Sequence, residues 1–154
     1  MRLLLDRNEV NPDSRERGGD TPLKCAARHG HEGIVKLLLD QKDVKPDWRV
    51  YHGRTPCWSA VNGGHEGIVK LLLDRREVNS ASRGLRGQTP LMCAVGDENE
   101  RIVKLLRLGE REVNPGSRDD NGRMPLWRAA IGENEGIAKL LLDREEVNLD
   151  SRDN

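Results

Sequence analysis

Residues 55–74, TPCWSAVNGGHEGIVKLLLD, carry the pattern that decides the fold. Threonine followed by proline suits the start of a helix, because the hydroxyl can accept a hydrogen bond from a free backbone N–H and proline fits the first helical position. Gly63 and Gly64 interrupt this helix, and a second helix begins near Glu66. Glu66 and Lys70 stand four residues apart, which is the favourable order for an exposed helical pair. The stretch therefore predicts two short helices joined by a tight turn.

The same pattern recurs along the whole chain. The helix starts recur as Thr21-Pro22, Thr55-Pro56, Thr89-Pro90 and Met124-Pro125. Each is followed by an apolar segment, at 34–40, 68–74, 102–108 and 137–143, and each apolar segment is followed by a valine and then, in most units, an asparagine. Leucines that have nothing to pack against within one unit must be buried by the next unit. Because the helix starts and the apolar segments recur with the same period, the sequence predicts a repeat protein.

We expect a single domain over residues 1–154. It would hold a partial repeat at 1–20 and full repeats at 21–54, 55–88, 89–123 and 124–154, each with two helices and a long loop. Terminal repeats need polar caps, and no cap is recognisable at either end. The sequence therefore predicts a segment of a longer array or an incomplete gene product.

Composition narrows the functional class. Apolar residues make up 35% of the chain and charged residues 34%, but the formal net charge is zero, so no net field would draw the chain to nucleic acid or an acidic membrane. No apolar run approaches the length of a membrane span. The three cysteines are odd in number and far apart, which suits a reducing compartment. We expect a cytoplasmic protein, monomeric or part of a longer array, without nucleic acid or membrane among its partners.

The Thr-Pro-Leu starts, the pair Ala26-Ala27, Gly-His-Glu at 30–32 and 64–66, the leucine triplets and the closing Val-Asn resemble ankyrin repeats, including arrays in fungal multidomain proteins. The resemblance implies an all-α ankyrin-repeat solenoid of stacked antiparallel helix pairs, with long loops projecting as fingers from one edge. It also implies a protein–protein interaction module that binds a partner through the fingers and the inner helix surface. An alternative is a structural spacer or regulatory arm of a larger signalling protein, without a ligand of its own.

Several positions depart from the family pattern. The family's histidine after Thr-Pro-Leu is replaced by Lys24, Trp58, Met92 and Trp127. We expect the two tryptophans to pack between repeats, with a binding face as the alternative. Met124 takes the place of a capping threonine, a change that costs roughly 0.5–2 kcal/mol.

By the resemblance, the variable contact positions lie just before each Thr-Pro and just after each first helix. The residues that we predict to touch a protein partner are Trp48, Tyr51, His52, Arg54, Arg28, His29, Asn62, Arg86, Gln88, Asp97, Asn121 and Arg123. Trp48 is the sharpest of them, because the other units carry serine there and tryptophan is frequent in binding hot spots. The alternatives are that these positions are tolerant surface and that Trp48 folds back on the neighbouring finger.

Arginine also recurs in every finger, at Arg15, Arg49, Arg83, Arg118 and Arg152. We expect these charges to be paired or screened within the stack, and the alternative is a basic ladder that meets an acidic partner. Cys25, His29 and His31 lie close together, but no second cluster completes the four ligands of a zinc site. No glycine-rich segment fits a phosphate loop, and no serine or cysteine has an independent histidine and acid beside it. The sequence therefore predicts no catalytic residue, no metal and no cofactor.

Overall fold

A computed structural model describes residues 10–108 and 113–143. Within these ranges the chain forms eight α-helices and two short 3-10 helices, and no strand. The helices are α2 (Pro22–His29), α3 (Glu32–Leu39), α4 (Pro56–Asn62), α5 (Glu66–Leu73), α6 (Pro90–Gly96), α7 (Glu100–Leu108), α8 (Pro125–Ile131) and α9 (Glu135–Leu142). The 3-10 helices are η1 (Tyr51–Gly53) and η2 (Leu85–Gly87).

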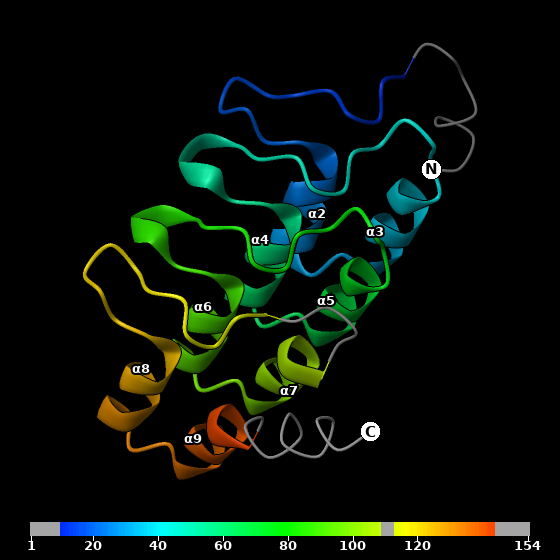
Figure 1. The fold of residues 1–154 in the computed structure, drawn as a ribbon. Coiled ribbons are helices and arrows are strands. Elements are labelled where there is room, and N and C mark those ends of the chain that lie inside the picture. Colours follow the sequence, from blue (N-terminus) through cyan, green and yellow to red (C-terminus); the bar gives the residue numbers. More distant parts are fainter. Residues whose placement is uncertain (1–9, 109–112, 144–154) are drawn as a thin grey trace, which may run out of the picture.

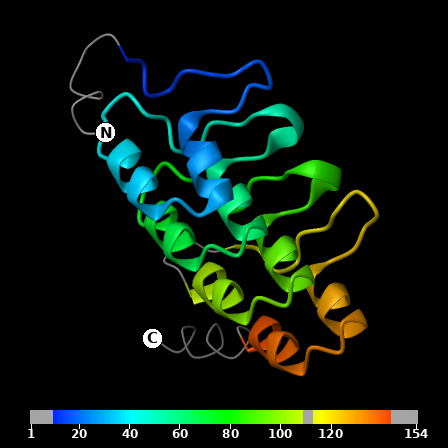
Figure 2. The ribbon, with the colours of Figure 1, turned by 180° about the vertical axis from the view of Figure 1, so that it is seen from behind.

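The helices form two layers. α2, α4, α6 and α8 contact one another in sequence order and make the inner row, while α3, α5, α7 and α9 make the outer row. Each inner helix also packs on the outer helix that follows it. Figure 1 and the reverse view in Figure 2 show the loops leaving the inner row on the same edge. This confirms the all-α stack of paired helices that the repeat pattern predicts.

Three of the four inner helices begin as predicted. The hydroxyl oxygens of Thr21, Thr55 and Thr89 accept hydrogen bonds from the backbone N–H three residues later, at 3.2–3.3 Å. Met124 occupies the same position before α8 and makes no such bond. The missing cap therefore weakens the start of the last described inner helix.

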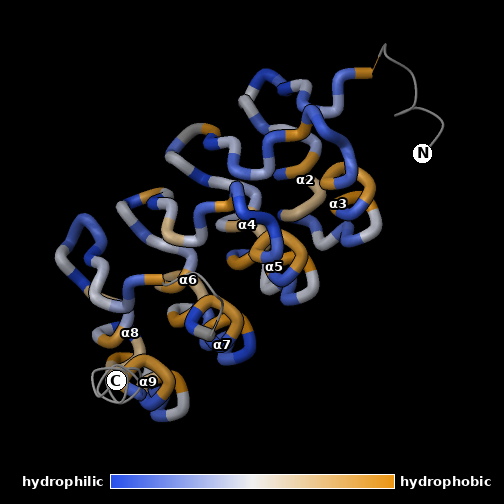
Figure 3. The backbone as a smooth tube through the Cα atoms, turned by 45° about the vertical axis from the view of Figure 1, so that its right-hand side comes forward, coloured by the Kyte–Doolittle hydropathy of each residue, from blue (hydrophilic) through white to orange (hydrophobic). Residues whose placement is uncertain are grey.

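The core lies between the two rows and between successive pairs. Leu23, Val69, Leu91 and Ile102 have no more than 1% of their surface exposed, and they come from four different helices. Figure 3 shows the apolar segments of the outer helices alternating with polar ones around each helix. Each pair thus covers the apolar side of the previous pair, and no pair holds a core of its own.

The outer helices carry exposed ion pairs four residues apart. Glu32–Lys36, Glu100–Lys104 and Glu135–Lys139 each have an N–O distance of 2.7 Å, as the sequence predicts. On α5 the carboxylate of Glu66 instead lies 3.7 Å from Arg101 of the next outer helix. These pairs are solvent-exposed, so each adds little to stability.

The turn between inner and outer helix takes two forms. Gly30 and Gly64 adopt left-handed φ angles of 77° and 72° in the first two pairs, whereas Glu98 and Glu133 adopt 55° and 53° in the last two. The next residue differs as well. His65 reaches back to the carbonyl of Arg28 at 3.0 Å, while Asn99 and Asn134 accept hydrogen bonds from the N-termini of α7 and α9.

Arg107 is the largest exception in the outer row. It stands where α3 and α5 carry Leu39 and Leu73, and it is 2% exposed. Its guanidinium donates hydrogen bonds to the carbonyl oxygens of Leu140 and Leu141, at 3.1–3.3 Å, at the end of α9. A buried cation in α7 therefore caps the C-terminus of the next outer helix.

Among the described helices, none has the length and apolar character that crossing a membrane requires.

Candidate interaction surface

Four loops project from one edge of the stack, and we call them finger 1 (10–20), finger 2 (44–54), finger 3 (78–88) and finger 4 (113–123). Each closes as a hairpin by a backbone hydrogen bond near its tip. The donor–acceptor pairs are Glu16 to Asp20, Val50 to Arg54, Gly84 to Gln88 and Asp119 to Arg123, at 2.8–3.3 Å. The fingers are thus ordered elements with a shared backbone geometry.

Neighbouring fingers are also tied to each other. The carboxylate of Asp47 accepts the backbone N–H of Asn79 at 3.1 Å, and the hydroxyls of Thr55 and Ser82 are 3.2 Å apart. Between fingers 3 and 4, the guanidinium of Arg83 donates to the Arg118 carbonyl at 2.8 Å. The fingers therefore present a continuous edge whose parts are held in register.

His52 and Arg86 occupy equivalent tips of fingers 2 and 3. Both side chains are exposed, and both residues adopt left-handed backbone angles, with φ of 64° and 58°. A non-glycine residue in this region costs free energy. Two of the predicted contact residues thus lie at strained, outward tips. The side chain of Tyr51, also predicted to touch a partner, lies outside the described part of the structure.

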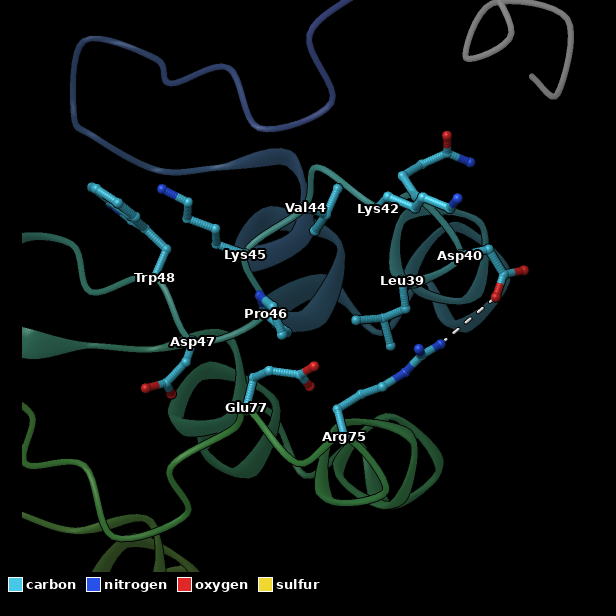
Figure 4. A pocket seen from close by; sticks show the side chains of 11 residues that line it. Leu39, Asp40, Lys42, Val44, Lys45, Pro46, Asp47, Trp48, Arg75 and Glu77 are labelled. Carbon is cyan, nitrogen blue, oxygen red and sulfur yellow. Dashed lines mark ion pairs between the residues drawn. The ribbon is translucent and has the colours of Figure 1, made fainter.

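Trp48 does not stand free in solvent. The Arg15 guanidinium of finger 1 lies 3.6 Å from the centroid of its ring, Lys45 Nζ lies 5.4 Å away, and the tryptophan is half-buried. This geometry matches the alternative that Trp48 folds back on the neighbouring finger. Figure 4 shows Trp48 at one end of a groove whose other end holds the 3.6 Å ion pair of Asp40 and Arg75.

Two arginines just before the starts of inner helices stack on tryptophans of the unit that follows. Arg54 lies 4.7 Å from the ring of Trp58, and Arg123 lies 5.2 Å from the ring of Trp127. The predicted packing of Trp58 is confirmed: it is 6% exposed and a methyl group on Gly84 would fall 2.7 Å from its Nε1. The equivalent Trp127 is 46% exposed. Its packing between repeats stays a prediction, because the segment equivalent to finger 3 in the next unit lies outside the described residues.

Gln88 holds the same place in finger 3 as those arginines. Its amide oxygen lies 3.8 Å from the Cys93 sulfur, and the side chain is half-buried. Gln88, Arg54 and Arg123 thus all contact the helix that follows them, which leaves only part of each side chain available to a partner.

The remaining predicted contacts line the ends of the inner helices. Arg28, His29, Asn62 and Asp97 are all exposed there. His29 Nδ1 is 2.9 Å from the Cys25 carbonyl oxygen, and the Arg28 guanidinium is 3.7 Å from the carboxylate of Asp20. Burial raises the pKa of Asp97, which the nearby charge of Arg128 partly offsets. The structure thus sets two exposed groups apart, the finger tips and the inner turns.

Finger 4 contains a buried and paired carboxylate, that of Asp119, which the sequence did not single out. Its side chain is fully buried, and it accepts the backbone N–H groups of Asn121 and Arg123, each at 2.9 Å. The Arg123 guanidinium lies 3.2 Å away and that of Arg128 3.6 Å away. Burial by itself raises the pKa of Asp119, but the two backbone N–H groups and the Arg123 charge outweigh it and lower the pKa.

These contacts assign Asp119 to the scaffold. Exposed Asn121, a predicted contact residue, is held at the tip by the bond from its backbone to this carboxylate. The equivalent positions of the other fingers hold Glu16, Val50 and Gly84, so the sequence contained no recurring signal from which the role of Asp119 could be predicted.

The recurring arginines largely serve the fingers themselves. Arg83 donates to the Gly87 carbonyl at 3.2 Å and Arg118 to the Gly122 carbonyl at 2.9 Å, each across its own hairpin. Arg83 also lies 3.5 Å from Asp120 of finger 4. Pairing within the stack therefore accounts for Arg83, Arg118 and the Arg15 that covers Trp48. Arg152 lies outside the described residues.

The cysteine thiols are poorly suited to nucleophilic chemistry. Burial, with a contribution from the Asp47 charge, raises the pKa of Cys57 to about 12. Burial and the Asp97 charge raise the pKa of Cys93 to about 12 as well, and burial raises that of the half-buried Cys25. These thiols stay protonated at neutral pH. In the described part of the chain no three histidine, cysteine or acidic side chains lie close enough to hold a metal ion.

Comparison with known proteins identifies the family. A family model described as ankyrin repeats (3 copies) matches residues 1–82 and 76–153, which together span nearly the whole chain. A search of the curated proteins found no match. The paired helices and the hairpin fingers agree with the family match over the described residues. The chain belongs to the ankyrin repeat family.

Proposed function

We propose that this chain is a protein-interaction module that binds its partner through the finger tips and the inner turns. The observation that carries the proposal is the contrast between positions that recur from unit to unit and exposed positions that vary. Helix caps, core leucines and turn geometry recur from unit to unit, whereas the exposed residues His52, Arg86 and Asn121 differ at equivalent tips. Ankyrin repeats are generally protein-interaction modules, and a rigid scaffold with variable exposed loops is suited to recognition. Three unpaired cysteines, Cys25, Cys57 and Cys93, favour a site inside the cell.

The predicted contact residues do not all support this proposal equally. His52, Arg86, Asn62 and Asp97 are exposed and well placed for a partner. In Arg54 and Arg123 one face of the guanidinium stacks on a tryptophan ring. Any contact with a partner would therefore use the other face. Trp48 enters the proposal mainly as the support of finger 2.

The proposal is tested by site-specific photo-crosslinking in cells. A crosslinking residue at His52 or Asn62 should capture the same partner, because both positions belong to the proposed surface. The matched control is a crosslinker at Lys70, which is exposed on the outer helix α5. A partner captured equally from Lys70, or different proteins from His52 and Asn62, would contradict the proposed surface.

A spacer or regulatory arm without a ligand is the alternative, and it makes a different prediction. If the chain is only a spacer, the amount of any protein captured by crosslinking should not change when His52 and Asn62 are replaced by alanine in the full chain. A loss of binding with an unchanged urea midpoint supports the interaction module.

A further inference from the structure

Fingers 2 and 3 carry a surplus of positive charge that the outer fingers lack. Finger 3 holds two arginines and no acid, and finger 2 holds three basic residues and one acid, Asp47. Finger 4 balances its charges, and finger 1 has one more acidic than basic residue. Their acidic residues are Asp13, Glu16, Asp20, Asp119 and Asp120, and their basic residues are Arg15, Arg17, Arg118 and Arg123. The positive surplus is therefore local, in a chain whose formal net charge is zero.

Two of these basic groups are available to a ligand. The side chains of Arg49 and Arg86 are exposed. Neither guanidinium makes a hydrogen bond or an ion pair with another described residue, although burial raises the pKa of the Asp47 carboxylate and the Arg49 charge acts to lower it. Asp47, the sole acid of the two fingers, is turned toward the scaffold, where it accepts the Asn79 N–H at 3.1 Å. Arg83 is already engaged with finger 4. The available charge thus comes from one arginine on each finger.

The same two fingers also expose an apolar side chain and a ring. Leu85, next to Arg86 in η2, is 37% exposed, and exposed His52 occupies the tip of finger 2. The two tips are fixed to each other, because a methyl group on Gly53 would fall 2.4 Å from the Arg83 carbonyl oxygen. Binding groups held this closely need little reorganisation when a ligand arrives.

From this placement we propose that Arg49, His52, Leu85 and Arg86 form a binding strip for an acidic protein segment in extended conformation. The inference rests on the proposed interaction function and names the class of partner. His52 and Arg86 are equivalent tip residues, and stacked helices lie about 8–10 Å apart, so the tips of fingers 2 and 3 share roughly that spacing. An extended chain advances about 3.3 Å per residue. Two carboxylates three residues apart, with an apolar residue between them, therefore match the two tips, with one carboxylate at Arg86 and the other at the basic end of finger 2.

An acidic protein segment fits this strip better than a nucleic acid does. A nucleic-acid site neutralises a series of phosphates along a backbone, whereas here the acids of fingers 1 and 4 flank the strip on both sides. Bidentate hydrogen bonding also pairs an exposed arginine well with a carboxylate. The strip is two fingers wide, which is the length of a short peptide motif.

The test is fluorescence anisotropy with a panel of labelled peptides on the full chain. The peptides carry two glutamates three residues apart with leucine between them, and the reference peptides replace both glutamates by glutamine. We expect the glutamate peptides to bind more tightly, and the R49Q/R86Q variant to lose about tenfold in affinity. The matched control is K36Q/K139Q on the outer helices, which should leave the affinity unchanged. Circular dichroism and a urea midpoint confirm that each variant folds.

Three results would overturn the inference: equal binding of glutamate and glutamine peptides, equal loss in both double variants, or tighter binding of single-stranded DNA of equal charge. The proposed function and the acidic strip can fail separately. If the crosslinked partner binds R49Q/R86Q normally but is lost on replacing Asn62 and Asp97, the interaction module stands and the acidic strip falls.

Discussion

The two halves of the stack form the same turns and helix starts with different residues. In α2–α5 the turn between paired helices relies on glycine, at Gly30 and Gly64, and the following histidines make no helix cap. In α6–α9 glutamate takes the left-handed position, and Asn99 and Asn134 cap the next helix.

Farther along, the C-terminal half adds the buried carboxylate of Asp119 and the buried guanidinium of Arg107. The positions equivalent to Asp119 hold Glu16, Val50 and Gly84, and those equivalent to Arg107 in α3 and α5 hold leucine. The backbone geometry is therefore what the fold requires, and either small, apolar residues or well-paired polar ones can satisfy it.

The largest expected effect is at Asp119. Asp119→Asn should lower the free energy of unfolding by about 3 kcal/mol, because it removes a charge that two arginines and two backbone N–H groups share. Urea denaturation at neutral pH measures it. The control is Asp120→Asn in the same finger, an exposed residue, which should cost less than about 1 kcal/mol. Equal costs would mean that the polar network adds nothing to the C-terminal half.

The same carboxylate makes stability depend on pH. Its folded pKa lies below the ordinary 3.8, so its contribution is present well above pH 3.8 and is lost as the pH falls through the lowered folded pKa. The original chain should therefore lose stability on acidification more steeply than Asp119→Asn. Parallel acid titrations of the two proteins would contradict this assignment.

Gly30→Ala should have the next largest effect, about 2 kcal/mol. The residue has a φ of 77°, and the added methyl group would fall 2.6 Å from the ring of His65. Gly64→Ala is the matched control: it has the same backbone strain but only Asn99 nearby, at 3.7 Å, and should cost about 1 kcal/mol. Pairing Gly30→Ala with His65→Ala should recover part of the difference in urea denaturation. Equal losses of unfolding free energy in Gly30→Ala and Gly64→Ala would mean that the contact with His65 adds nothing to the cost.

Asn99→Ala should cost about 1 kcal/mol, the usual value of a lost helix cap. His31 precedes α3 at the equivalent place and makes no cap, so His31→Ala should change the unfolding free energy by only a few tenths of that amount. His31→Asn should then stabilise the N-terminal half by transferring the cap to it. A destabilised His31→Asn variant in thermal denaturation would show that the two turns are not interchangeable.

The smallest effect belongs to Glu98→Gly, which removes left-handed strain from a residue with a φ of 55°. We expect a gain of about 0.5 kcal/mol, since the flexibility of glycine in the unfolded chain offsets part of the relief. Gly64→Glu is the reciprocal change and should destabilise the chain in the same urea assay. A loss in both variants would mean that each half is tuned to its own turn residue.

The repeated parts of this fold could be predicted from the sequence because they depend on neighbouring residues. A threonine caps the backbone three positions later, and a glutamate pairs with a lysine four positions later, so Thr89 and Lys104 behaved as expected. The contacts between units could not be predicted. The stacking of Arg15 on Trp48, and the partnership of Glu66 with Arg101, depend on how residues about one repeat apart come together in space.

The candidate surface shows the same limit. The resemblance pointed to Arg54 and Arg123 as contact residues, but each lies over a tryptophan four positions later. That spacing is familiar within a helix, whereas here it spans the junction of a loop and a helix. Asp119 was missed because a single acid in a loop carries no pattern until the backbone folds around it.

The three tryptophans fall in different repeats and in different surroundings: Trp48 beneath an arginine, Trp58 buried against a glycine, and Trp127 largely exposed to water. The chain holds no others. Their fluorescence should therefore differ in emission wavelength and in access to quenchers, with Trp127 the reddest and Trp58 the bluest. The protein therefore carries a reporter in three of its four full repeats, and the unfolding of those repeats can be followed without any added label.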